Sequence, residues 1–86
     1  MRYRSRTDII AKILRSASGE YKVGVTRIMY ESYTSYAQIK EYLPFLVHNG
    51  FLEYNEGKRK YRTTKKGKYF LKLYSDVDGS LKAVPM

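Results

Sequence analysis

Apolar residues near the start of the chain recur at spacings of three and four residues, which predicts an amphipathic helix. Ser5 is followed three residues later by Asp8, a plausible N-cap arrangement, and Gly19 marks the end of the pattern. The predicted inner face of this helix consists of Ile9, Ile10, Ile13, Leu14 and Ala17.

Two shorter elements are predicted next. The alternating stretch "EYKVGV", residues 20–25, favours a small edge strand. The stretch "TRIMYES", residues 26–32, is typical of a two-turn helix with Thr26 as its N-cap and with Ile28 and Met29 facing inward.

The segment "TSYAQIKEYLPFLVHNGFLEY", residues 34–54, carries the strongest helix signal. Ser35 and Gln38 have the spacing of a capping box, and Gly50 suits a left-handed C-terminal cap. Pro44 lies well past the first turn, so we expect a kink one turn before it, with the helix continuing. The predicted inner face consists of Ile39, Leu43, Leu46 and Val47.

The end of the chain predicts a hairpin and a last helix. Two strand-like runs, "FLEYN" and "KYRTT", surround the turn "EGKR". Thr64 then caps a helix that begins with "KKGKYFLKLY", and Pro85 would end it. Apolar residues continue along this helix with the spacing of a coiled-coil seam. The predicted seam consists of Phe70, Tyr74, Val77 and Leu81.

The order of these elements is α-β-α-α-β-β-α, which is the order of a winged helix-turn-helix domain. We therefore predict an α+β fold that is mostly α. The domain would span residues 1–75, and the last helix, residues 64–84, can extend into a dimerisation coiled coil.

Composition narrows the possible partners. The chain has 86 residues, a net charge of +9, 15% aromatic residues and no cysteine. Such an excess of positive charge favours polyanions, with nucleic acid first and anionic membrane second. The aromatic content favours a folded protein, and one this small gains from a partner subunit. Charged residues interrupt the apolar run near the N-terminus, so we expect neither a secretory signal nor a membrane span, and a cytoplasmic, nucleoid-associated protein.

The helix that begins after Ser35 is the predicted reading helix, because the second helix of a helix-turn-helix pair lies in the major groove. Ser, Gln, Lys and Glu side chains can all hydrogen-bond base edges. An ordinary capped surface helix is the plainer interpretation. The predicted base-reading residues are Ser35, Tyr36, Gln38, Lys40 and Glu41.

Cations cluster in and after the predicted hairpin. Lys60 and Arg62 alternate with residues that would face the core, so the opposite side of the hairpin would be basic. Three lysines follow in the first turn of the last helix, where the helix dipole disfavours each by ~0.3–1 kcal/mol, and a bound anion would explain their position. The arginines near the N-terminus form either a minor-groove arm or a frayed end. A solvated charged face is the alternative for the whole run. The predicted phosphate-binding residues are Lys58, Arg59, Lys60, Arg62, Lys65, Lys66, Lys68, Arg4 and Arg6.

Other chemistry finds little support in the sequence. His48 stands alone, without carboxylates or cysteines at ligand spacing, and no nucleophile–base pair or phosphate-binding glycine loop is present. We therefore expect no enzyme activity, no metal, no cofactor and no small-molecule ligand.

The stretches "RSRTDIIAKIL", "SYAQIKEYLPFLVHNGFLEY" and "YRTTKKGKYFLKLY" resemble a family of small archaeal winged helix-turn-helix proteins, predicted transcriptional regulators that include Sulfolobus-type chromatin-associated proteins. The resemblance covers roughly residues 4–75. It implies binding of double-stranded DNA, often by a homodimer joined through an antiparallel coiled coil of the last helix. It also implies a recognition helix at residues 35–49 and a wing at residues 56–60. Lys65 departs from the family, whose members often have an acidic residue there.

These observations together predict a double-stranded DNA-binding homodimer that acts as a transcriptional regulator or a chromatin-associated factor. Two other functions stay open. A basic winged helix can bind RNA, for instance ribosomal RNA, and outward aromatic side chains such as Phe45 can bind a protein partner.

Overall fold

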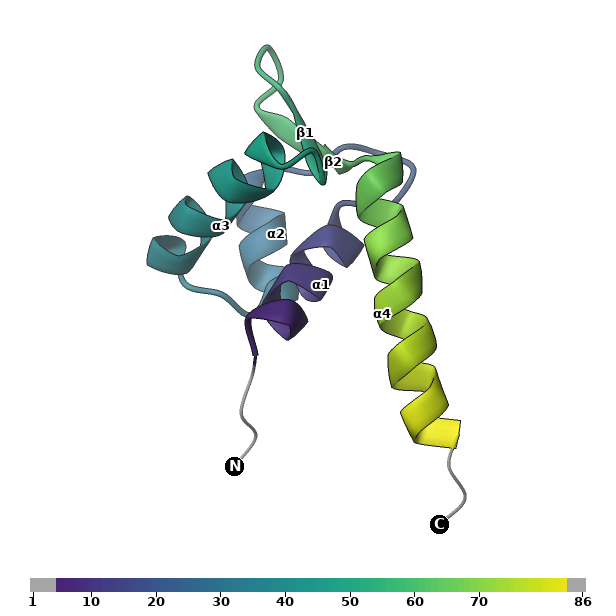
Figure 1. Ribbon diagram of the computed structural model, residues 1–86. Helices are drawn as coiled ribbons and strands as arrows, with labels where there is room; N and C mark the ends of the chain where they lie inside the picture. The colour runs from purple at the N-terminus through teal and green to yellow at the C-terminus, as the bar shows by residue number, and fades with distance from the viewer. Residues whose placement is uncertain (1–4, 84–86) are drawn as a thin grey trace.

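The computed structural model of the chain describes residues 5–83, and the side chains of residues 5–74. Four helices and one two-stranded antiparallel sheet make up this part of the chain, which confirms the mostly helical α+β prediction. Figure 1 shows the hairpin at one end of the first three helices and the long last helix beside them. The elements are α1 (Arg6–Ser16), α2 (Val25–Ser32), α3 (Tyr36–His48), β1 (Leu52–Asn55), β2 (Lys60–Thr63) and α4 (Lys65–Ala83).

The small edge strand predicted at residues 20–25 is reduced to one bridge. Val23 and Tyr61 exchange two backbone hydrogen bonds, of 2.9 and 2.6 Å. The strand cannot extend further because Gly24 is already the N-cap of α2. The prediction that Thr26 caps α2 is therefore wrong, since Thr26 lies inside the helix.

The N-cap predicted at Ser5 and the capping box predicted at Ser35 are both capping boxes in the structure, and they explain where α1 and α3 begin. The Ser5 hydroxyl accepts from the Asp8 amide at 3.1 Å, and the Asp8 carboxylate accepts from the Ser5 amide at 3.3 Å. Ser35 and Gln38 repeat this exchange at the start of α3. Each box satisfies amide groups that a helix leaves unpaired at its N-terminus.

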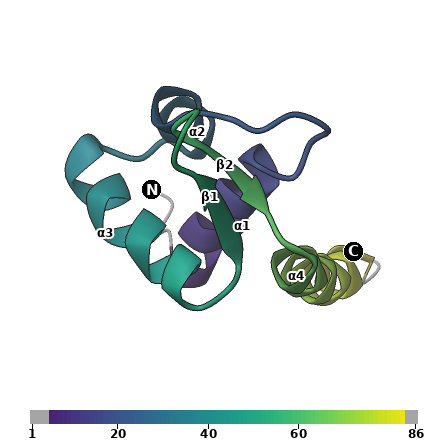
Figure 2. The same ribbon diagram turned by 90° about the horizontal axis from the view of Figure 1, so that it is seen from above.

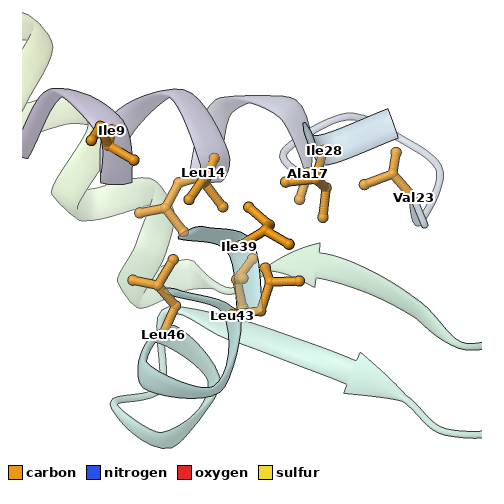
Figure 3. Close-up of a cluster of buried hydrophobic side chains, with 10 residues drawn as sticks. Ile9, Leu14, Ala17, Val23, Ile28, Ile39, Leu43 and Leu46 are labelled. Atoms are coloured by element: carbon orange, nitrogen blue, oxygen red, sulfur yellow. The ribbon is translucent and has the colours of Figure 1, made fainter. Parts of the chain in front are cut away.

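The core lies where α1, α2 and α3 converge, as Figure 3 shows for side chains from all three helices. Fully burying one such aliphatic side chain contributes about 1.5–3 kcal/mol. The predicted inner faces of α1 and α3 are largely confirmed, with Ile10 and Val47 only half-buried. The buried apolar residues are Ile9, Ala11, Ile13, Leu14, Ala17, Val23, Ile28, Ile39, Leu43, Leu46 and Leu52.

A left-handed glycine ends α3, as predicted. Gly50 has φ 81° and donates its amide hydrogen to Val47 at 3.1 Å. Phe51 donates to the Leu46 carbonyl at 2.9 Å. These two bonds form a Schellman motif, which turns the chain directly into β1. The helix runs through Pro44 as one segment, as expected, and the kink stays a prediction.

A close joint connects α4 to the end of α3. Thr64 caps α4 as predicted, since its hydroxyl accepts from the Gly67 amide at 3.1 Å and donates to the Gly50 carbonyl at 2.5 Å. A Cβ atom on Gly67 would lie 2.3 Å from the Phe51 carbonyl oxygen, so only glycine fits there. From this joint α4 runs alongside α1, away from α2 and α3 (Figure 2).

Candidate nucleic-acid interface

The first turn of α3 is exposed, but two of its predicted base-reading side chains have structural roles. Ser35 Oγ accepts from the Gln38 amide at 3.2 Å, and Gln38 Oε1 accepts from the Ser35 amide at 3.0 Å. Bidentate pairing with adenine needs both ends of the glutamine amide. Within this capping box, Gln38 Oε1 already accepts one hydrogen bond, so Gln38 offers a base its NH2 hydrogens and one remaining lone pair.

The other three predicted reading residues are exposed and less constrained. Tyr36 is 60% exposed. Lys40 Nζ lies 5.6 Å from the centre of the Tyr36 ring, a contact that contributes about 0.5–1 kcal/mol at an exposed site. Glu41 is exposed on the same helix. These three side chains therefore offer a phenol, a cation and a carboxylate to a ligand.

The hairpin forms the predicted wing, with β1 and β2 paired in register from Leu52 opposite Thr63 to Asn55 opposite Lys60. The Tyr54 and Tyr61 rings pair across the strands, with centroids 4.7 Å apart. Burial, with a smaller contribution from Tyr54, raises the pKa of Tyr61, so its phenol stays neutral at pH 7. The aromatic pair stiffens the ribbon below the turn.

The wing tip presents its cations to solvent. Asn55 Oδ1 accepts from the Lys58 amide at 2.8 Å and so shapes the turn of residues 56–59. Arg59 adopts a left-handed φ of 54°, which costs a residue with a side chain about 1–2 kcal/mol. The side chains of Lys58, Arg59 and Lys60 are exposed, and none hydrogen-bonds a described residue.

The start of α3 and the base of the wing lie next to each other. Tyr36 and Lys40 of α3 line a hollow of about 220 Å³ together with Tyr61 of β2 and Val25 of α2. A ligand that touches the exposed turn of α3 can therefore also reach the wing.

The predicted phosphate-binding lysines of α4 divide into two kinds. Lys65 and Lys68 are exposed. Lys66 instead donates from Nζ to the Asn49 carbonyl at 2.8 Å and lies over the Phe51 ring, 5.0 Å from its centre. A cation is favourable at that place because it meets the C-terminal end of α3. The position of Lys66 at the start of α4 thus needs no bound anion.

The predicted N-terminal arm needs a correction. Arg6 is the first residue of α1, because the capping box at Ser5 starts the helix there. Its guanidinium lies 5.9 Å from the centre of the Tyr42 ring, in a hollow of about 410 Å³ shared with Gln38 and Glu41. Arg4 lies outside the described residues. Arg6 thus belongs to α1 and lies beside α3, and it is not part of an arm before the helix.

The predicted dimer seam begins against the chain's own core. The Phe70 ring lies 5.7 Å from the Phe51 ring and 6.4 Å from the Tyr74 ring. The Tyr74 hydroxyl donates to the Asp8 carboxylate, which lowers the pKa of Asp8. The side chains of the two remaining seam residues, Val77 and Leu81, lie outside the described part.

Three residues missed by the sequence analysis line hollows in the structure. Leu73 is 47% exposed beside Phe70 and Tyr74. Tyr21 and Lys22 face the basic side of the wing across a small cleft. Their basic and aromatic types were visible in the sequence, but only the Val23–Tyr61 bridge brings them beside the wing.

The described residues hold neither a helix that could cross a membrane nor a cluster that could bind a metal ion. None of the helices traced there combines the length and apolar character that crossing a bilayer requires. Histidine and acidic side chains in that same part of the chain form no group of three that could hold a metal ion.

This architecture matches a known protein family and a solved structure. The winged helix-turn-helix family matches residues 3–82. The uncharacterized protein MJ0287 of Methanocaldococcus jannaschii is 35% identical over 74 residues, which cover 86% of this chain and 70% of that protein. The crystal structure of Sso10a-2, described as a DNA-binding protein from Sulfolobus solfataricus, matches with a TM-score of 0.70 at 30% identity, over 96% of this chain and 99% of that one. The chain belongs to the winged helix-turn-helix family.

Proposed function

We propose that this protein binds double-stranded DNA, with α3 in the major groove and the wing along the phosphate backbone. The observation that carries the proposal is the exposed cationic tip, residues 58–60, of a wing whose base lies beside the exposed first turn of α3. Lys65 and Lys68 would extend the phosphate contacts from the start of α4. Sso10a-2, described as a DNA-binding protein, supports the proposal through its similarity over nearly the whole chain.

Different side chains would supply affinity and base selectivity. Cations neutralise phosphates and supply affinity that is independent of sequence. Base selectivity rests on Tyr36, Lys40 and Glu41, because Ser35 and part of Gln38 serve the capping box. Such a protein acts as a transcriptional regulator with modest selectivity or as a chromatin-associated factor.

We also propose that it binds DNA as a homodimer joined through α4. Leu73, Thr7, Phe70 and Tyr74 line a hollow of about 420 Å³ whose surface is almost wholly apolar. A second copy of α4 would cover the exposed part of Leu73. Sedimentation equilibrium should show a dimer for the unmodified chain and a monomer for Leu73→Lys, while Lys72→Gln on the same helix stays dimeric. A monomeric unmodified chain would refute this second proposal.

Duplex binding across a salt series tests the main proposal. If five or six phosphates are contacted, log K should fall against log salt with a slope of about −5. The variant Lys58→Ala/Arg59→Ala/Lys65→Ala should reduce the magnitude of this slope by up to about 3.

A charge-matched control separates local contacts from net charge. The variant Lys12→Ala/Arg15→Ala/Lys72→Ala also removes three charges, but from α1 and further along α4, and it should keep the original slope. Equal effects of the two triple variants would mean that the wing holds no phosphates. Tighter binding to a folded RNA than to duplex DNA of equal length would favour the RNA-binding alternative instead.

A further inference from the structure

A small cationic cleft lies between the α1–α2 connection and the wing. It has a volume of about 210 Å³, roughly seven times the ~30 Å³ that one molecule occupies in liquid water. The residues that line it are four cations and one phenol, with no carboxylate among them: Tyr21, Lys22, Lys58, Lys60 and Arg62.

Hydrogen bonds hold the two walls of this cleft together. The Val23–Tyr61 bridge joins them through two backbone bonds, of 2.9 and 2.6 Å. Arg62 Nη2 also donates to the Glu20 carbonyl at 3.3 Å, from the wing to the opposite wall. The cations therefore stay close together despite their mutual repulsion.

Arg62 carries a second sign of a ligand site. Its side chain is half-buried, and within the described residues its Nε–H group is buried without any hydrogen-bond acceptor. A buried donor left unpaired is unfavourable, and the planar guanidinium fork matches the oxygens of a phosphate. An oxyanion in the cleft would offset the clustered positive charge and would bind the part of the guanidinium that lines the cleft, next to the buried Nε.

We infer that this cleft binds one phosphate group, and, resting on the proposed function, that the phosphate belongs to the backbone of duplex DNA. The Arg62 guanidinium would bind its oxygens directly. Lys22, Lys58 and Lys60 would supply charge around it, and the Tyr21 hydroxyl one hydrogen bond. Tyr21 is 78% exposed, so its phenol is free to turn toward the phosphate. The connection between α1 and α2 thereby joins the wing in contacting nucleic acid.

The first arm of the test uses inorganic phosphate and the full chain labelled with nitrogen-15. The Arg62 Nε–H signal should shift in a saturable manner as phosphate replaces chloride at constant ionic strength. The shift should be lost in Lys22→Gln and kept in Lys72→Gln, which removes an equal charge from α4. Equal melting temperatures would verify that both variants fold. An Arg62 signal that does not respond to phosphate would overturn the inference.

The second arm identifies the source of the phosphate by duplex binding across a salt series. Lys22→Gln should reduce the magnitude of the slope by about 0.9, the value for one phosphate, and Lys72→Gln should leave it unchanged. If the unmodified chain binds duplex and the two variants behave alike, the assignment to the DNA backbone is overturned while the proposed function stands. If the unmodified chain does not bind duplex but the Arg62 signal still shifts, the proposed function fails, and the cleft is a site for free phosphate.

Discussion

The first turn of α3 and the tip of the wing are two exposed surfaces that use their polar side chains in opposite ways. In α3, Ser35 and Gln38 hydrogen-bond each other's backbone amides. At the wing tip, Lys58, Arg59 and Lys60 have no such bonds to the described residues. The helix side chains serve the fold, whereas the wing side chains are available to a ligand.

If the protein binds DNA as proposed, this difference would make its binding tight but weakly selective. Contacts from the wing depend on charge and are screened by salt. Contacts from α3 depend on three side chains, Tyr36, Lys40 and Glu41, of which only the last two carry charge. We therefore expect salt to change affinity more than sequence does.

The largest effect is expected at the joint where α4 meets the end of α3 and the wing. Gly67→Ala adds a Cβ atom 2.3 Å from the Phe51 oxygen and 2.5 Å from Thr63 Cγ2. Although alanine favours helix by ~1 kcal/mol, we expect the clash to dominate and to lower the free energy of unfolding by about 1–3 kcal/mol. Urea unfolding measures the change. Gly19→Ala, with no atom within 4 Å, is the control and should unfold like the unmodified chain.

A substitution at Ser35 distinguishes a structural role in capping α3 from a role in reading bases. Ser35→Ala removes the N-cap and should destabilise the protein by about 1 kcal/mol. The salt slope of DNA binding should stay the same, because the capping hydroxyl contacts no phosphate. Ser35→Thr retains a capping hydroxyl and should recover most of the stability. Unchanged stability combined with altered base preference would instead identify Ser35 as a reading residue.

A pair of substitutions at Arg59 separates charge from backbone strain in the wing. Both Arg59→Gly and Arg59→Ala remove the cation, so each should reduce the magnitude of the salt slope by about 0.9. Only glycine adopts φ 54° without strain, so the Gly variant should be about 1 kcal/mol more stable than the Ala variant. Thermal unfolding measures this difference. Equal stabilities would show that the turn tolerates any residue.

The smallest effect is expected where α1 meets α4, away from both surfaces. The Tyr74 hydroxyl and the Ser5 amide hold the pKa of Asp8 below its ordinary value of 3.8. A carboxyl group whose pKa is lowered by folding stabilises the folded state at pH values above its ordinary pKa. This stability is lost as the pH falls through the lowered pKa of the folded state. Tyr74→Phe should therefore weaken the dependence of melting temperature on pH below about pH 4. Asp8→Asn should weaken it further, and a Phe variant as acid-sensitive as the unmodified chain would contradict this assignment.

Local signals in the sequence predicted the fold well. The Ser5 N-cap, the Ser35 capping box, the Gly50 cap and the hairpin depend on residues within a few positions of each other, and all are present. The strand at residues 20–25 failed because alternation alone does not show that Gly24 must begin α2. Arg6 was misplaced although the Ser5 cap was predicted, because a helix capped at Ser5 already contains Arg6 as its first residue.

The candidate site was less predictable, because its residues meet through tertiary contacts. Lys66 belongs by sequence to a cationic run, yet its partner is a carbonyl 17 residues away. Arg62 is bound to a carbonyl 42 residues earlier, a distance over which residue type gives no guidance. Charge identified the surface, but the pairing of each cation required the fold.

The joint at Gly67 also has a geometric consequence. Three contacts attach the start of α4 to the end of α3. They are the Thr64 bond to Gly50, the Lys66 bond to Asn49 and the close approach of Gly67 to Phe51. In a dimer joined through α4, the length of this helix would set the distance between the α3 helices of the two subunits. One added helical turn is about 5.4 Å, or between one and two base pairs of duplex. Lengthening α4 by one turn would then change which half-site spacings on DNA the protein accepts, with no change to any side chain that touches a base.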